Sequence, residues 1–140
     1  MRPLSVTLLS LAVFILAAYN LTGLVAGLVR WPALAPLNLA LPLWALLAWD
    51  GIWGALWLTI AQGLWRLAGW SRRLALIAFP LHAVLTIGRE ALFAKGDYER
   101  GRLPFIVTLT VAFSVWGIVT LMSRGNQNAF RSDHEAIPKE

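Results

Sequence analysis

The residues of this chain that could carry chemistry are few and lie inside apolar sequence. Asp50 is the only acidic residue well inside an apolar stretch, and an intramembrane carboxylate is costly and therefore a candidate functional group. His82, Thr86 and Arg89 are spaced by four and three residues, which places them on one face of a helix. Asp50, His82, Arg89 and the neighbouring Glu90 define a predicted intramembrane polar cluster.

This cluster permits transport, structural or cofactor chemistry. Asp50 with His82, Arg89 or Glu90 could line a path for protons or ions. An ion pair between Asp50 and Arg89 that orients the helices is the simpler expectation. His82 is the one candidate axial ligand for haem or chlorophyll, but His134 lies in the polar tail, so a bis-histidine haem within the chain is not available. We predict no catalytic residue, no metal site and no cofactor.

Four apolar stretches must position these residues. They run over residues 4–29, 39–65, 74–93 and 103–122, and each reaches the roughly 20 residues that cross a bilayer core. The composition is 59% hydrophobic and only 14% charged, which departs from that of soluble proteins. The sequence predicts an all-α bundle of four transmembrane helices over residues 1–123, with short loops and a polar cytoplasmic tail over residues 124–140.

The basic residues predict the orientation and exclude some partners. The formal net charge is +5, and alternating spans put seven Lys and Arg residues on the side of both termini and five on the other. This distribution favours cytoplasmic termini, as in a bacterial inner membrane. Without a basic cluster among exposed aromatic residues we expect no nucleic-acid partner, and without cysteine thiol-disulfide and iron-sulfur chemistry are excluded.

The connections are expected to be irregular. Pro32 and Pro36 predict a non-helical first loop, and Pro42 is expected in the first turn of a helix that begins near Leu41. Residues 94–102 are polar and bounded by glycines, which predicts a solvent-facing turn. The tail after Met122 is expected to be loosely ordered, with Phe130 as a possible anchor.

Small residues predict where helices pack. Asn20, Gly23 and Gly27 share one face of the first span, and Ser114 and Gly117 share one face of the fourth. In lipid, small residues let helix backbones approach closely. We expect both faces to serve packing within the chain; the alternative for Gly23 and Gly27 is the contact face of a homodimer.

The second span has two contrasting faces. Trp49, Trp53 and Trp57 recur every four residues, and a face of small and polar side chains lies nearly opposite, formed by Gly51, Ala55, Thr59 and Gln62. The small face is expected to pack into the bundle. The tryptophans are then expected to face lipid, a partner protein or a flat hydrophobic ligand.

The junction between the second and third spans, GLWRLAGWSRRLAL over residues 63–76, resembles a helix-turn-helix junction of small predicted four-helix bacterial membrane proteins of unknown function. Tryptophan and arginine fix such a turn at the headgroup level. The resemblance covers about a tenth of the chain. It implies the four-span topology and no activity.

The expected function is therefore not enzymatic. The first hypothesis is an accessory or scaffold subunit of a larger membrane complex, for example an energy-transducing one, in contact with lipid and with other membrane subunits. The alternative is a small oligomeric transporter or channel that uses the polar cluster. The third is a pigment- or haem-binding subunit.

Overall fold

The computed structural model describes residues 3–36, 41–93 and 97–130. Within these ranges the elements are helices, with no strand: α1 (Leu4–Val29), α2 (Trp31–Leu34), α3 (Leu43–Trp65), α4 (Gly69–Phe93), α5 (Asp97–Met122) and α6 (Arg124–Ala129). The prediction of an all-α fold is confirmed. Four of the helices, α1, α3, α4 and α5, are long and apolar enough to cross a membrane.

The long helices form because a bilayer leaves the backbone no other partner, so each N–H and C=O must be satisfied inside its own helix. Prolines mark two of the helix starts. Pro3 precedes α1 and Pro42 precedes α3, and their carbonyls accept from the N–H groups of Val6 at 3.1 Å and Ala45 at 2.9 Å. A proline fits there because the first N–H groups of a helix have no partner within it.

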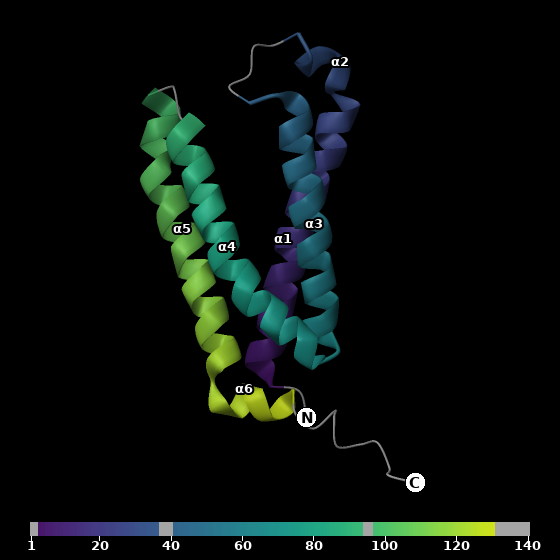
Figure 1. Ribbon diagram of the computed structural model, residues 1–140, viewed down its shortest axis with the longest axis vertical. Helices are drawn as coiled ribbons and strands as arrows, with labels where there is room; N and C mark the ends of the chain where they lie inside the picture. The colour runs from purple at the N-terminus through teal and green to yellow at the C-terminus, as the bar shows by residue number, and fades with distance from the viewer. Residues whose placement is uncertain (1–2, 37–40, 94–96, 131–140) are drawn as a thin grey trace.

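The long helices are arranged as two pairs (Figure 1). Helix α1 packs along α3, and α4 packs along α5. The pairs are joined by the short turn between α3 and α4, and they diverge toward the opposite end of the molecule. Helix α4 changes direction near its middle, where Pro80 lies inside the helix, and a proline there removes a backbone hydrogen bond and kinks the helix.

Glycines set the close approach of the paired helices. A Cβ on Gly54 of α3 would lie 2.8 Å from Cδ2 of Leu21 of α1. A Cβ on Gly27 of α1 would collide with Leu47 of α3, and one on Gly117 of α5 would lie 2.7 Å from the Phe79 ring of α4. Ser114, on the same face of α5, donates to the Phe79 carbonyl at 3.3 Å. The predicted small faces of the first and fourth spans therefore lie at contacts within the chain.

The turn between α3 and α4 is tightly built. Leu67 has a left-handed backbone with φ 56°, the N–H of Ala68 donates to the carbonyl of Gly63 at 2.9 Å, and the N–H of Leu67 donates to that of Leu64 at 3.1 Å. This pair of bonds is a Schellman motif, which satisfies the last carbonyls of the helix. Gly63 also lies directly against Ser71 at the start of α4.

Three expectations about the connections are wrong. The first loop contains the one-turn helix α2, because Pro32 occupies its first turn, where a proline is tolerated. Pro42 is the N-cap of α3, which therefore begins at Leu43 rather than near Leu41. The stretch predicted as a turn is helical from Asp97, the first residue of α5; residues 94–96 lie outside the described residues.

The first part of the C-terminal tail is ordered, contrary to expectation. Residues 124–129 form α6, which lies across the end of the bundle near the start of α1 (Figure 1). The Asn126 amide donates to the Thr120 carbonyl at 2.6 Å and its oxygen accepts from the Ser5 hydroxyl at 3.0 Å. Phe130 is buried in the core, as its expected role as an anchor requires. Residues 131–140 lie outside the described residues.

Candidate functional site

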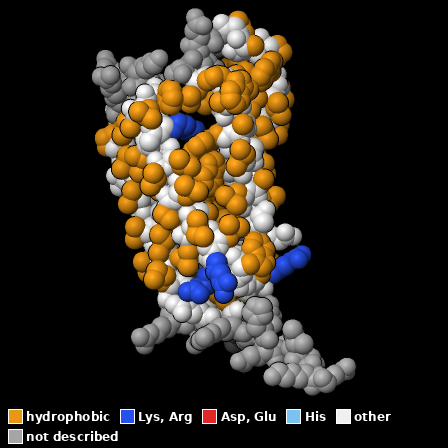
Figure 2. Space-filling model, in the orientation of Figure 1, with side chains coloured by type: hydrophobic (Ala, Val, Ile, Leu, Met, Phe, Trp, Pro, Cys, Tyr) orange, Lys and Arg blue, Asp and Glu red, His pale blue; other side chains and the backbone are white. Residues whose placement is uncertain are grey.

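The candidate site lies between α3 and α4, where the two helix pairs diverge. We call this region the outer wedge and define it by Trp49, Asp50 and Trp53 of α3 and by His82, Thr86, Arg89 and Glu90 of α4. Figure 2 shows an opening between the pairs toward the end away from the α3–α4 turn, with a basic side chain in it. The bend of α4 and the tight α3–α4 turn determine how far apart α3 and α4, the two walls of the wedge, lie. The shape of the wedge therefore depends on the backbone and not on a single side chain.

Arg89 is held by groups on both walls. Its Nη2 donates to Oε1 of Glu90 at 2.7 Å, and its guanidinium carbon lies 5.1 Å from the centre of the Trp49 ring. A cation at this distance from an indole face is attracted by the ring quadrupole. Arg89 thus connects α4 to α3 through an aromatic side chain.

Asp50 does not form the expected ion pair with Arg89. A Cβ on Gly23 of α1 would lie 2.7 Å from Oδ2 of Asp50, so the carboxylate lies against the α1 backbone. The described residues offer Asp50 no hydrogen bond within 3.5 Å, while Arg89 pairs with Glu90, its neighbour along the chain. Arg89 is still near enough for the two charges to interact. The missing Cβ of Gly23 is what leaves room for the carboxylate at this depth.

His82 lies at the narrow part of the wedge. Its ring packs edge-on against Trp53, with ring centres 4.5 Å apart, and against Trp57 at 5.3 Å. Its Nε2 lies 3.4 Å from the hydroxyl oxygen of Thr86, one helical turn away on α4. All three contacts lie within the chain: the two indoles are on α3, and Thr86 is on the same helix as His82.

Below His82 the wedge is closed by aromatic side chains. Trp57 is fully buried, and its ring packs against Trp53 with centres 5.6 Å apart and against Phe79 with centres 5.2 Å apart. The indole Nε1 of Trp57 is buried without a hydrogen-bond partner among the described residues, which is a cost that a buried donor ordinarily avoids. The interior between this layer and the α3–α4 turn is filled by aliphatic side chains such as Ile60 and Leu64. The wedge is therefore open at one end only.

The orientation expected for α3 is reversed in the structure. Trp53 and Trp57 are 5% and 0% exposed, whereas Ala55, Thr59 and Gln62 of the opposite face are exposed. The large rings face inward because the diverging helices leave a gap that only large side chains fill. Thr59 tolerates the outward position because its hydroxyl donates to the Ala55 carbonyl, one turn earlier, at 2.8 Å.

Other members of the predicted sets are distributed as follows. Gly51 lies in ordinary contact with α1, its Cβ position 3.6 Å from Leu24, and Trp49 is half-buried in the wedge wall. Asn20 is buried, and its amide donates to the Leu16 carbonyl of its own helix at 2.8 Å. The structure therefore places Asp50, His82, Arg89 and Glu90 around one opening. Trp49 and Trp53 line the same opening.

Sequence reasoning missed Phe79, which closes the wedge with Trp57. A signal for it exists in the chain, because Phe79 precedes His82 by three residues and lies on the same face of α4. The opening that the divergence of α3 and α4 produces was not predicted either.

The residues that could hold a cofactor are limited. No group of three or more His, Cys, Asp and Glu residues among those described could hold a metal ion. A macrocycle bound to Nε2 of His82 would have to displace the Thr86 hydroxyl and separate the imidazole from two indoles. Axial ligation by His82 stays a prediction with no supporting contact.

Comparisons with models of protein families, with curated proteins and with solved structures found no match. The resemblance of residues 63–76 implies a topology of four membrane spans. That topology agrees with the four apolar helices that could span a membrane.

Proposed function

We propose that this protein is a non-catalytic accessory subunit of a larger membrane complex, and that its outer wedge receives part of a partner subunit. The observation that carries this proposal is a wedge lined by charged side chains, open at one end and closed by aromatic rings at the other. The proposed setting is a bacterial inner membrane with both termini in the cytoplasm, as the basic residues favour.

The cost of charge in lipid is the reason to expect a partner. Asp50 lies seven residues into α3, about 10 Å from its start, which is within the hydrocarbon if the helix spans the bilayer. The carboxylate has no hydrogen-bond donor among the described residues, and leaving it toward lipid costs several kcal/mol. A partner helix with a hydroxyl, amide or basic side chain would satisfy Asp50 and cover the inner faces of the diverging pairs.

Site-specific photocrosslinking in the source membrane tests this proposal. A benzophenone side chain replaces Trp49 in the wedge, and a matched variant carries it at Trp116 of α5, which is 41% exposed on the outside. The proposal expects one defined protein adduct from position 49 and lipid adducts from position 116. Lipid adducts alone from both positions would refute a partner in the wedge.

A transporter is the second candidate, favoured by the one-sided opening above the aromatic layer. In that case the wedge is a polar vestibule, Asp50 binds the cation or proton, and Trp57 and Phe79 form the closed end. Asp50→Asn separates the two candidates, because it keeps the shape and removes the charge. Loss of ion or proton flux in proteoliposomes with the complex intact supports transport, whereas loss of co-purifying subunits supports the accessory role.

A further inference from the structure

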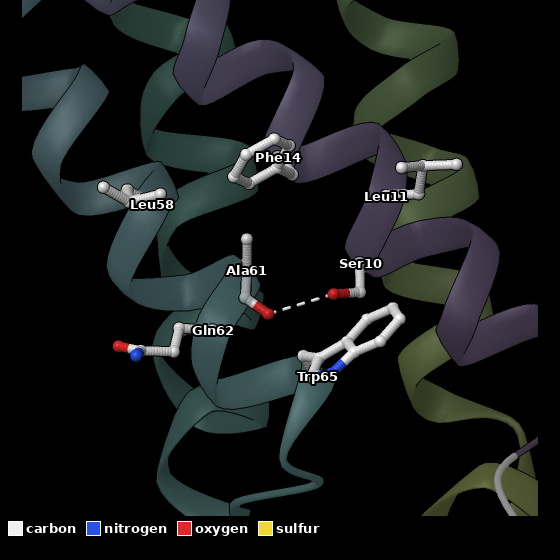
Figure 3. Close-up of a pocket in the computed structure, with 7 residues that line it drawn as sticks. All are labelled: Ser10, Leu11, Phe14, Leu58, Ala61, Gln62 and Trp65. Atoms are coloured by element: carbon white, nitrogen blue, oxygen red, sulfur yellow. Dashed lines mark hydrogen bonds between the residues drawn. The ribbon is translucent and has the colours of Figure 1, made fainter.

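A second hollow lies outside the bundle, between α1 and α3, and the wedge does not extend into it. This groove has a volume of about 470 Å³, and in Figure 3 its side chains surround an open space between the two helices. Helix α1 contributes Ser10, Leu11 and Phe14, and α3 contributes Leu58, Ala61, Gln62 and Trp65. Because Leu11, Phe14 and Leu58 are about half exposed, the groove opens to the surroundings of the protein.

The floor of the groove is fixed by a buried hydrogen bond between the two helices. The Ser10 hydroxyl donates to the Ala61 carbonyl at 2.9 Å (Figure 3), and both residues are almost fully buried. Small side chains at the floor and larger ones, Phe14 and Trp65, at the two ends produce an elongated hollow. The groove is therefore maintained by the contact that holds α1 against α3.

One end of the groove leads to a positive charge. Leu58, Gln62 and Arg66 are spaced by four residues, and the N–H of Arg66 still donates to the Gln62 carbonyl at 3.0 Å, so all three lie on one face of α3. Arg66 ends this helix and is exposed. Figure 2 shows basic side chains at this end of the molecule. An apolar groove that ends at a basic residue near the end of a spanning helix matches the charge and polarity of a phospholipid.

We propose that this groove binds one acyl chain of an anionic phospholipid, with its phosphate at Arg66 and its ester oxygens at the Gln62 amide. Hydrocarbon in the groove contributes little selectivity, because the surrounding lipid is equally apolar. Selectivity for an anionic headgroup comes from the arginine.

Native mass spectrometry of the full chain, released from mild detergent, tests the proposal. The protein is titrated with phosphatidylglycerol and with phosphatidylcholine of the same acyl chains, and the dissociation constant of the first bound lipid is measured for each. We expect tighter binding of phosphatidylglycerol. Arg66→Gln should weaken it about fivefold, the effect of one basic residue near an anionic lipid, and Arg73→Gln, which removes an exposed arginine at the same end, should change it less than twofold.

A second pair of variants tests the groove itself. Leu58→Trp fills the groove, and Ile77→Trp places the same side chain on the exposed face of α4. The proposal expects Leu58→Trp to abolish the preference for phosphatidylglycerol and Ile77→Trp to retain it, with both variants monodisperse by size-exclusion chromatography. Equal binding of the two lipids, equal effects of the two arginine variants, or a dimer that excludes lipid would each overturn it.

Discussion

Replacement of Gly54 by alanine tests one of the close approaches between α1 and α3. The new Cβ would lie 2.8 and 2.9 Å from Cδ2 and Cγ of Leu21 and 3.3 Å from its backbone nitrogen. The Leu21 side chain can move to another rotamer, but its backbone nitrogen can move only with α1. Helices α1 and α3 must therefore separate slightly. Overpacking of this kind costs about 1 to 3 kcal/mol.

Gly88→Ala is the matched control. Gly88 lies within α4, and nothing lies within 4 Å of the position of its Cβ. Alanine is favoured over glycine in a helix by about 1 kcal/mol, and this gain is common to both variants. The difference between the two variants therefore isolates the overpacking, and Gly54→Ala should be less stable than Gly88→Ala by about 1 to 3 kcal/mol.

The assay is unfolding by sodium dodecyl sulfate in lipid–detergent micelles, followed by tryptophan fluorescence. The chain has eight tryptophans, and those in the wedge report on packing between α3 and α4. We expect a lower denaturant midpoint for Gly54→Ala and an unchanged or higher one for Gly88→Ala. Equal midpoints for the two variants would refute the close approach of α1 and α3 and, with it, the packing role of the small residues.

Three further predictions follow from the bend, a buried hydrogen bond and the C-terminal helix. Pro80→Ala should straighten α4 and widen the wedge: straightening by about 20° over the 13 residues beyond it moves its outer end by about 7 Å. Spin labels at Trp44→Cys and Leu92→Cys, both exposed in a chain without other cysteines, measure this distance, and an unchanged distance would contradict the role of Pro80. Ser10→Ala should lower stability by about 0.6 kcal/mol, the mean for hydrogen bonds between helices in a membrane, in the same unfolding assay. Asn126→Ala should release α6 from Ser5 and Thr120 and increase trypsin cleavage at the C-terminal end, with intact protection arguing against the contact.

Much of the fold could be predicted because the bilayer restricts the choices. An apolar stretch of this length can satisfy its backbone only as a helix, so the long helices follow from composition. The helix ends were less predictable, since a proline can either precede a helix, as Pro42 does, or lie in its first turn, as Pro32 does. Helix α6 could not be predicted from apolar sequence. It is held by a hydrogen bond between Asn126 and Ser5, which lie 121 residues apart along the chain.

The candidate site was predicted in its members but not in its geometry. The spacing of Trp49, Trp53 and Trp57 defines a face without stating whether that face points inward, because lipid and protein interior are both apolar. The inward direction follows from the divergence of α3 and α4 from their turn, which leaves a gap that the rings fill. Likewise, Asp50 and Arg89 were expected to pair because both lie toward one end, but Gly23 gives the carboxylate a place on α1 and Glu90 satisfies the arginine.

The Schellman turn at Leu67 has a mechanical consequence. It joins the two helix pairs at one end, where Gly63 lies directly against Ser71. The 25 residues of α4 span roughly 37 Å, so this contact acts as the fulcrum of a long arm. A rotation of about 5° at the fulcrum moves the far end by about 3 Å, roughly the size of a water molecule. Small angular changes at the turn would therefore widen or narrow the open end of the wedge.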